Sequence, residues 1–273
     1  MRDLTVSLIQ TELAWEDVSA NLIMFEERLS AIDKSTDLII LPEMFASGFT
    51  MNASKVAQSM DGAAVQWLRT RARRSEAVVA GSLVIEEKGR YFNRLVWAQP
   101  DGDLVTYDKR HLFRMSGEEK VYHAGDCLVT VELHGWKIRP FICYDLRFPL
   151  WTRNWSNGYD VALFVANWPA RRSAHWQMLL RARAVENQSY VIGVNRVGVD
   201  GNDVVYSGDS MIIDPAGRDL FHQPQDVCEV TMTLSRNNLE KYRREFPAWM
   251  DADHEMLSPA LRAQFECESK QQQ

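Results

Sequence analysis

The sequence predicts one α/β domain in which helices pack outside a β-sheet. Short apolar segments of strand length are intermixed along the chain with segments in which apolar residues recur at helical spacing. No linker rich in proline, glycine or serine interrupts them, and no internal repeat is present. The 273 residues, 46% of them hydrophobic, suit one large domain with a sizeable core, or at most two domains.

The first half of the chain opens on a strand, because Leu4, Val6 and Leu8 alternate with polar residues. An amphipathic helix is expected next, since Leu22 and Phe25 begin a helical spacing of apolar residues. The elements expected up to the first hairpins are a helix at about 16–33, a buried strand at 37–41, a loop at 44–60, a helix at about 61–75, and antiparallel strands at 78–85 and 91–97. The Asp101-Gly102 pair predicts a further hairpin turn.

The second half is expected to be richer in strands. After an irregular segment at about 110–127, the expected elements are strands at 128–133 and 136–142, a helix from about residue 147, a strand at 160–166, a helix at 173–187, strands at 190–195, 204–213, 218–221 and 228–233, and a helix at about 235–244. The strong turn signal Asp214-Pro215-Ala216-Gly217 separates two of these strands.

The charge and cysteine content exclude several classes of function. The formal net charge is −6, so the basic excess typical of nucleic-acid binding is missing. No apolar run approaches the roughly 20 residues that span a bilayer, and the first residues do not resemble a signal peptide. The cysteines form no C-x-x-C pair or Cys/His cluster of the kind that binds zinc. We expect a soluble cytoplasmic protein with no metal, nucleic-acid or membrane partner.

Three apolar segments each end in a side chain that can react. Glu43 follows the segment 38–41 and Pro42, Lys109 follows the segment 104–108, and Cys143 follows Phe141-Ile142. If these strands share a sheet, the carboxylate, the ammonium and the thiol would converge at one end, where ligands gather in α/β proteins.

Together these groups permit covalent catalysis. The carboxylate can take the thiol proton, the ammonium can lower the thiol pKa and stabilise an oxyanion, and the sulfur can attack a carbonyl carbon to form a thioester. Singly, each residue has a commoner interpretation, because cysteines at strand ends are often buried and inert, and isolated glutamates and lysines mostly lie on the surface.

The three blocks resemble the signatures of the nitrilase, or carbon–nitrogen hydrolase, superfamily. They are Leu41-Pro42-Glu43, Tyr107-Asp108-Lys109-Arg110-His111-Leu112-Phe113, and Cys143-Tyr144-Asp145-Leu146-Arg147-Phe148-Pro149. The resemblance implies that Cys143 is the nucleophile, that Glu43 is the general base and that Lys109 is the cationic partner. It also implies that the backbone N–H of Tyr144 joins Lys109 in an oxyanion hole.

The same resemblance has consequences for architecture. It implies an αββα sandwich formed by residues 1–245, with a C-terminal tail at 246–273. Members of the superfamily pair through helices near the nucleophile, so we expect a homodimer across which the sandwich is extended. No metal or organic cofactor is implied.

The superfamily often carries a second glutamate in the loop between the lysine and the cysteine. Glu118 and Glu119 are the candidates, and Glu118 is favoured by its position before Gly125. The alternative is that this segment is an acidic surface loop.

Within the superfamily, the chain is similar to the omega-amidase branch, which acts on 2-oxoglutaramate and related monoamides of dicarboxylic acids. The motifs that carry this likeness are Asn167-Trp168-Pro169, Ser173-Ala174-His175-Trp176 and Arg181-Ala182-Arg183-Ala184-Val185-Glu186-Asn187-Gln188. Such a substrate has a carboxylate far from its amide, and a guanidinium can bind it with two hydrogen bonds. Arg172 is the first choice, followed by Arg171 and Arg147, although the pair at 171–172 is also consistent with a solvated helix start. The expected pocket walls are Phe45, Phe113, Tyr144 and Trp168.

Three alternatives to an omega-amidase are a Cys/His mechanism, a different substrate and a non-catalytic role. A Cys/His dyad using His111 would leave Glu43 and Lys109 without a role, so we assign His111 to the structure of its loop. A different amide, an N-carbamoyl compound or a nitrile is an alternative substrate on the same scaffold. A non-catalytic binding protein is the remaining alternative.

Overall fold

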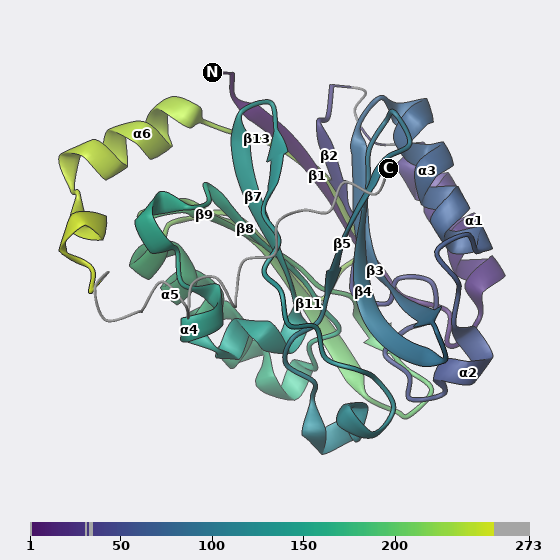
Figure 1. The fold of residues 1–273 in the computed structure, drawn as a ribbon. Coiled ribbons are helices and arrows are strands. Elements are labelled where there is room, and N and C mark those ends of the chain that lie inside the picture. The colour runs from purple at the N-terminus through teal and green to yellow at the C-terminus, as the bar shows by residue number, and fades with distance from the viewer. Residues whose placement is uncertain (1, 31, 33–34, 254–273) are drawn as a thin grey trace.

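Two β-sheets pack face to face, and helices cover the outer face of each sheet (Figure 1). This arrangement is taken from a computed structural model that describes residues 2–30, 32 and 35–253. It confirms the predicted αββα sandwich.

The first sheet joins the N-terminal and C-terminal parts of the described chain. Its strand order is β13-β1-β2-β3-β4-β5, with β1 to β3 parallel and the remaining neighbours antiparallel. The strands are β1 (Leu4–Gln10), β2 (Leu38–Ile40), β3 (Val78–Glu87), β4 (Arg90–Ala98), β5 (Leu104–Asp108) and β13 (Cys228–Leu234).

The second sheet has a parallel centre. Its order is β10-β11-β9-β8-β7-β6, β12 pairs with β11, and β7, β8 and β9 run parallel. The strands are β6 (Val131–Leu133), β7 (Trp136–Ile142), β8 (Val161–Val165), β9 (Tyr190–Val194), β10 (Val197–Val199), β11 (Val205–Ile213) and β12 (Asp219–Pro224). The residues that follow β7, β8 and β9 therefore lie along one edge of this sheet.

The helices lie on both sides of the sandwich. They are α1 (Val18–Leu29), α2 (Ala53–Val56), α3 (Ala63–Ser75), α4 (Pro149–Thr152), α5 (Ser173–Asn187) and α6 (Arg236–Glu245). Helices α1 and α3 cover the first sheet, whereas α5 packs on β9 and β11 of the second (Figure 1). The first turn of α1 is capped by Asp17, whose side chain accepts from the backbone N–H of Ala20.

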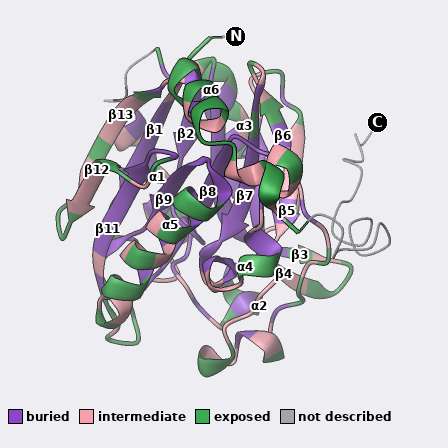
Figure 2. Cartoon of the chain, turned by 90° about the vertical axis from the view of Figure 1, so that its left-hand side faces the viewer, coloured by how far each residue is buried: buried purple, intermediate pink, exposed green. Residues whose placement is uncertain are grey.

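The main hydrophobic core lies between the sheets. It includes Leu8 and Trp97 of the first sheet and Phe141 and Phe164 of the second, all almost fully buried. A second cluster, which includes Phe25 and Leu68, fills the space between the first sheet and its helices. The central strands are correspondingly buried on both faces, and exposed residues concentrate on the outer sides of the helices (Figure 2).

The structure differs from the predicted elements in three places. The expected loop at 44–60 contains the single turn α2, and the short strand β10 was not predicted. The helix expected from residue 147 is replaced by a 3₁₀ turn, Cys143–Arg147, followed by the four residues of α4. Pro149 explains this break, because a proline pushes the preceding residue, here Phe148, into an extended conformation.

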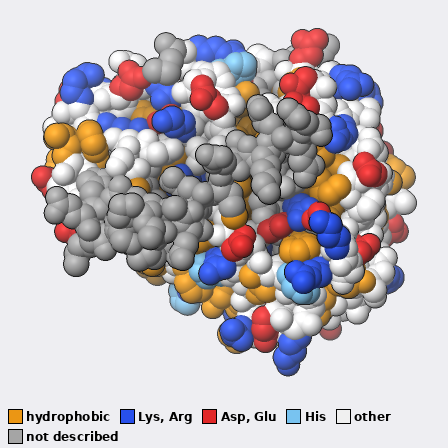
Figure 3. All heavy atoms as spheres, in the orientation of Figure 1, with side chains coloured by type: hydrophobic (Ala, Val, Ile, Leu, Met, Phe, Trp, Pro, Cys, Tyr) orange, Lys and Arg blue, Asp and Glu red, His pale blue; other side chains and the backbone are white. Residues whose placement is uncertain are grey.

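The surface and the C-terminal region add two observations. No helix within the described residues is long and apolar enough to cross a membrane. Positive and negative side chains are interspersed over the face shown in Figure 3. Of the predicted tail at 246–273, the structure describes residues up to 253, including a 3₁₀ turn at Ala248–Asp251, and residues 254–273 lie outside the described part of the chain.

Candidate active site

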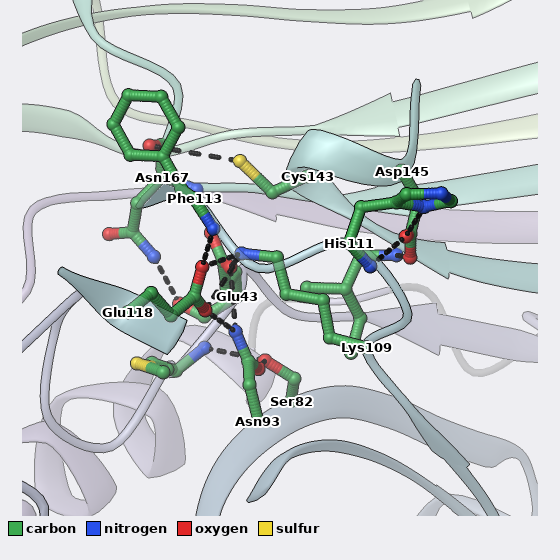
Figure 4. A network of polar contacts seen from close by, with 12 residues as sticks. Glu43, Ser82, Asn93, Lys109, His111, Phe113, Glu118, Cys143, Asp145 and Asn167 are labelled. Atoms are coloured by element: carbon green, nitrogen blue, oxygen red, sulfur yellow. Dashed lines mark hydrogen bonds and ion pairs between the residues drawn. The ribbon is translucent and has the colours of Figure 1, made fainter. Parts of the chain in front are cut away.

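Lys109, directly after β5, is the centre of a buried group of charges. Its side chain is about 1% exposed. Its Nζ atom lies 2.9 Å from Oε1 of Glu43 and 3.0 Å from both carboxylate oxygens of Glu118 (Figure 4). The structure therefore brings together Glu43, Lys109 and Glu118, which are separated in the sequence, and it favours Glu118 over Glu119 as the second glutamate.

Glu43 is held by donors from both sheets. The side-chain amide of Asn93, in β4, donates to Oε1 at 2.8 Å, and the backbone N–H of Asn167, beyond β8, donates to Oε2 at 2.7 Å. The backbone carbonyl of Asn93 also accepts from the backbone N–H of Lys109 at 2.9 Å. One asparagine thus contacts both the Glu43 carboxylate and the backbone of Lys109, and both oxygens of Glu43 have defined partners.

Cys143 sits at a sharp turn directly after β7. Its backbone φ is +45°, a left-handed conformation that is uncommon for residues other than glycine. The sulfur lies 4.0 Å from the backbone carbonyl of Asn167, and the side chain reaches the floor of the main cavity. This is the geometry of a strained turn that points a nucleophile out of a sheet edge.

The electrostatics of the group favour a protonated thiol and a charged lysine. Burial raises the pKa of Cys143 well above its ordinary value, and the charge of Glu43 raises it further, while the Lys109 ammonium opposes this. Burial alone would lower the pKa of Lys109, but the carboxylates of Glu118 and Glu43 raise it overall. Burial raises the pKa of Glu118; Lys109 opposes this rise, and the charge of Glu43 adds to it. A sulfur in this environment would need a nearby base to take its proton before it could act as a nucleophile.

A cavity of about 650 Å³ opens above Cys143 and Lys109. Five of the residues predicted to contact substrate line it: Tyr144, Phe113, Trp168, Arg147 and Arg172. Arg171 lines it as well. The sequence therefore identified part of the cavity wall, whereas the lining residues at 49–52, at 115–116 and between 200 and 206 were not predicted.

The prediction for Phe45 was wrong. Phe45 is fully buried and packs edge-on against Phe25, with ring centroids 5.5 Å apart, so it belongs to the core under α1 and α3. Phe49, four residues later in the same loop, occupies the position on the cavity wall that was expected for Phe45. Its ring lies 5.1 Å from Nζ of Lys109 and lines the cavity. The chain turns between the two phenylalanines, where the backbone N–H of Gly48 donates to the carbonyl of Met44 at 2.8 Å and the φ of Gly48 is +75°.

The arginines on the cavity wall lack acidic partners. The guanidinium of Arg172 lies over the ring of Phe113 at 5.1 Å, and that of Arg147 lies over Trp168 at 4.8 Å. Within the described part of the chain, neither these two nor Arg171 forms an ion pair with a carboxylate. Burial lowers the pKa of Arg172, and the charges of Arg171 and Arg147 lower it further. An anion in this cavity would relieve that repulsion.

His111 contacts Asp145 and the aromatic residues around it. Its Nδ1 lies 2.8 Å from Oδ1 of Asp145, and its ring stacks on Phe148 with centroids 3.7 Å apart. This agrees with the structural role expected of His111.

Some residues of the site were not identified from the sequence. Asn93 gives no signal of its own, because the next residue of β4, Arg94, is also polar. Asn167 occurs in a motif already noted, but its contact with Glu43 joins residues 124 positions apart. Asp145 belongs to the cysteine block, yet its partners come from a distant strand.

Comparisons with known proteins agree with this geometry. The carbon-nitrogen hydrolase family matches residues 5–244. Omega-amidase YafV of Escherichia coli (strain K12) is 47% identical over 254 residues, covering 93% of this chain and 98% of that protein. The 2-oxoglutaramate amidase of Bacillus subtilis (strain 168) is 32% identical over 251 residues, covering 90% and 96%. The crystal structure of XC1258 from Xanthomonas campestris, a CN-hydrolase superfamily protein with an arsenic adduct in its active site, is 45% identical with a TM-score of 0.91, covering 93% of this chain and 98% of that one.

Proposed function

The chain belongs to the carbon-nitrogen hydrolase family, and on that premise we propose that it is an omega-amidase. It releases ammonia from the terminal amide of 2-oxoglutaramate or a similar dicarboxylate monoamide, through a thioester on Cys143. The names of its relatives, omega-amidase and 2-oxoglutaramate amidase, support this substrate class.

One observation carries the proposal. The cavity has a thiol and an ammonium at its floor and three guanidiniums on its wall without acidic partners among the described residues. A linear molecule with an amide at one end and a carboxylate at the other would satisfy both ends at once. A guanidinium binds a carboxylate with paired hydrogen bonds, and Arg172, which is partly buried, is the first choice for this contact. Phe113, Tyr144, Trp168 and Arg147 would enclose the carbon chain between them.

The acylation step follows from the buried charges. Glu43 takes the thiol proton as the sulfur of Cys143 forms a bond to the amide carbon, and the C=O electron pair moves onto oxygen. The Lys109 ammonium and the Tyr144 backbone N–H stabilise that oxyanion. When the tetrahedral intermediate collapses, the C–N bond breaks, the nitrogen takes up the proton that Glu43 received, either directly or through Glu118, and ammonia leaves with Glu43 again a carboxylate.

Deacylation reuses the same groups. Glu43 removes a proton from water, whose oxygen attacks the thioester carbon, and the oxyanion returns to the same site. The C–S bond then breaks, the proton returns to sulfur, and the dicarboxylate is released. Both half-reactions are complete with the described side chains and water, so no metal or cofactor takes part in the proposed scheme.

We also propose a homodimer that extends the sandwich through the face carrying α4 and α5. Exposed apolar side chains on these helices, Leu150, Met178 and Val185, support that contact, because exposed apolar side chains favour association. We further place the hydrolase domain at residues 1–245 and the enzyme in the cytoplasm, where a thiol nucleophile stays reduced.

A steady-state comparison of 2-oxoglutaramate, succinamate and glutamine tests the function. We expect 2-oxoglutaramate to have the highest kcat/KM and glutamine the lowest, because an ammonium group beside the arginines is repelled. Preference for an uncharged aliphatic amide, an N-carbamoyl compound or a nitrile would replace the substrate assignment. No ammonia release from any of them would leave a binding protein as the better interpretation.

A further inference from the structure

The side chain of Asp145 is fully buried two residues beyond Cys143, and its carboxylate has four contacts of hydrogen-bond length. We propose that Asp145 is a positioning residue that fixes the Lys109 ammonium relative to the Cys143 sulfur, and with it the geometry of the oxyanion site. This inference rests on the proposed thioester mechanism. Asp145 does not line the cavity, so it acts through its neighbours and not on the substrate.

Asp145 holds the chain on both sides of Lys109. The hydroxyl of Tyr107 donates to Oδ2 at 2.7 Å, and the backbone N–H of His111 donates to Oδ1 at 2.9 Å (Figure 4 shows the contacts with His111). The Nδ1 atom of His111 adds a second contact to Oδ1 at 2.8 Å. The residues two before and two after the lysine are therefore attached to one carboxylate, which restricts the backbone that carries the ammonium.

The direction of the Tyr107 hydroxyl is determined by a further donor. The indole N–H of Trp151 donates to the Tyr107 oxygen at 2.9 Å, so the phenolic proton is directed to Asp145. Burial and the charge of Asp145 raise the pKa of Tyr107 well above its ordinary value, which keeps that proton in place.

The same carboxylate holds the nucleophile's turn. Oδ2 of Asp145 accepts from the backbone N–H of Ile142, the residue before Cys143, at 3.1 Å. Asp145 itself lies within the 3₁₀ turn that begins at Cys143. The positive φ at Cys143 is a strained conformation that persists only where surrounding contacts hold it. Asp145 supplies such a contact, because its hydrogen bond to Ile142 spans the strained residue from the C-terminal side to the N-terminal side.

These contacts cross between the two sheets. Lys109 follows β5 of the first sheet, whereas Cys143 follows β7 of the second. Apart from the contact of Asn167 with Glu43, their relative position would otherwise depend on sheet packing, and a misplacement of about 1 Å can cost ~100-fold in rate. A buried carboxylate with four hydrogen-bond contacts is held rigidly, so it restricts the distance between the Lys109 ammonium and the Cys143 sulfur more closely than sheet packing does.

The Asp145→Asn variant tests the proposal. The amide nitrogen of asparagine cannot accept hydrogen bonds, so the two donors that face this nitrogen in the variant lose their acceptor. We expect kcat for the wild type's best amide to fall ~100-fold or more, as on loss of an oxyanion donor, while KM stays within about threefold. Asp160→Asn is the matched control. Asp160 is also buried and accepts from Lys137, Arg236 and Arg243, but it precedes β8 at the opposite end of the sheet. That control should lower Tm and leave kcat unchanged.

A second measurement separates positioning from general instability. Succinic semialdehyde adds to the Cys143 thiol and forms a tetrahedral adduct whose oxygen occupies the oxyanion site, whereas iodoacetamide alkylates the sulfur without forming an oxyanion. We expect Asp145→Asn to weaken aldehyde binding ~100-fold while the alkylation rate stays within about threefold. Unchanged aldehyde affinity, or equal losses in both reactions, would overturn the proposal.

A second variant and a second criterion cover the cases in which Asp145→Asn does not fold or the wild type shows no amidase activity. If Asp145→Asn does not fold, Tyr107→Phe removes one of the four contacts, and we expect ~10-fold losses in kcat and aldehyde affinity with KM unchanged. Unaltered values in that variant would reject the role. If the wild type hydrolyses no amide, the proposed function fails, but the aldehyde and alkylation measurements still decide whether Asp145 positions the site.

Discussion

Glu118 places both of its carboxylate oxygens 3.0 Å from Nζ of Lys109. Its Oε2 also accepts from the backbone N–H of Phe113, so the loop that carries Glu118 is closed onto the lysine. The second glutamate is thus part of the same buried charge group as Glu43, and both carboxylates depend on one ammonium for their compensation.

Replacing Glu118 with glutamine should therefore damage catalysis while the side chain keeps its size. We expect kcat to fall ~100-fold or more, because the Lys109 ammonium loses a charged partner and the buried charge group loses its balance. Glu119→Gln is the adjacent control, and steady-state kinetics should show near-normal activity for it. Equal losses in the two variants would show that the loop, and not the Glu118 carboxylate, is responsible.

A covalent intermediate should form on Cys143 alone. Mass spectrometry of the enzyme quenched during turnover of a slow amide should show an acyl adduct on the peptide containing Cys143, and Cys143→Ser should lose nearly all activity. Cys228, a free and partly buried cysteine, provides the control. Activity should persist in Cys228→Ser, and an adduct on Cys228 would redirect the mechanism.

Glu43→Gln should change the thiol pKa of Cys143 and the rate of hydrolysis in opposite senses, making the thiol more acidic and the hydrolysis slower. The charge of Glu43 raises the pKa of Cys143, so removing that charge should lower the thiol pKa. The rate of hydrolysis should nevertheless fall ~100-fold or more, because the variant lacks the general base. The rate of alkylation by iodoacetamide, followed against pH, should therefore rise at a lower pH in the variant than in the wild type.

Cys228 gives that experiment an internal standard. Burial and the charge of Glu229 raise the pKa of Cys228 to about 11, and the main charges that act on this thiol are those of Glu229, Arg28 and Asp226. Its alkylation profile should be the same in both proteins. A Cys143 profile that stays in place or moves to higher pH in Glu43→Gln would contradict the assigned electrostatics.

Arg172→Ala should weaken binding of the substrate's carboxylate. A charge-assisted hydrogen bond contributes about 1.5–3 kcal/mol, which corresponds to a rise in KM for 2-oxoglutaramate of ~10–100-fold. The KM for butyramide, which has no carboxylate, should not change. Arg218→Ala, which removes an exposed arginine paired with Asp214, is the control variant. An unchanged KM in Arg172→Ala would shift the role to Arg147 or Arg171.

Much of the fold could be predicted because its strands are short apolar runs with clear turn signals. The helix at 173–187 agrees with α5, and the hairpins at Gly89 and Asp101-Gly102 are present. The failures have local causes. Pro149 divides the expected helix after Cys143, and β10 is only three residues long, too short for its periodicity to be recognised.

The part of the site that could be predicted consists of reactive side chains that directly follow strands in the sequence. Glu43, Lys109 and Cys143 each follow an apolar run, and the sheet topology brings these ends together. The supporting residues were not predictable in the same way, because the contacts of Asn93 and Asn167 with Glu43 join distant segments. The exchange of Phe45 for Phe49 depends on how one loop turns, which composition does not reveal.

The division of the site between two sheets has a consequence for how the enzyme loses activity. Glu43 and Lys109 come from one layer and Cys143 from the other, and β13 completes the first layer by pairing with β1. A proteolytic fragment that keeps only one layer carries an incomplete set of reacting groups, however well it retains secondary structure. Ammonia release is therefore a direct indicator of whether the two layers are assembled, and residual catalysis in a refolding mixture should report the fraction of fully paired sandwich.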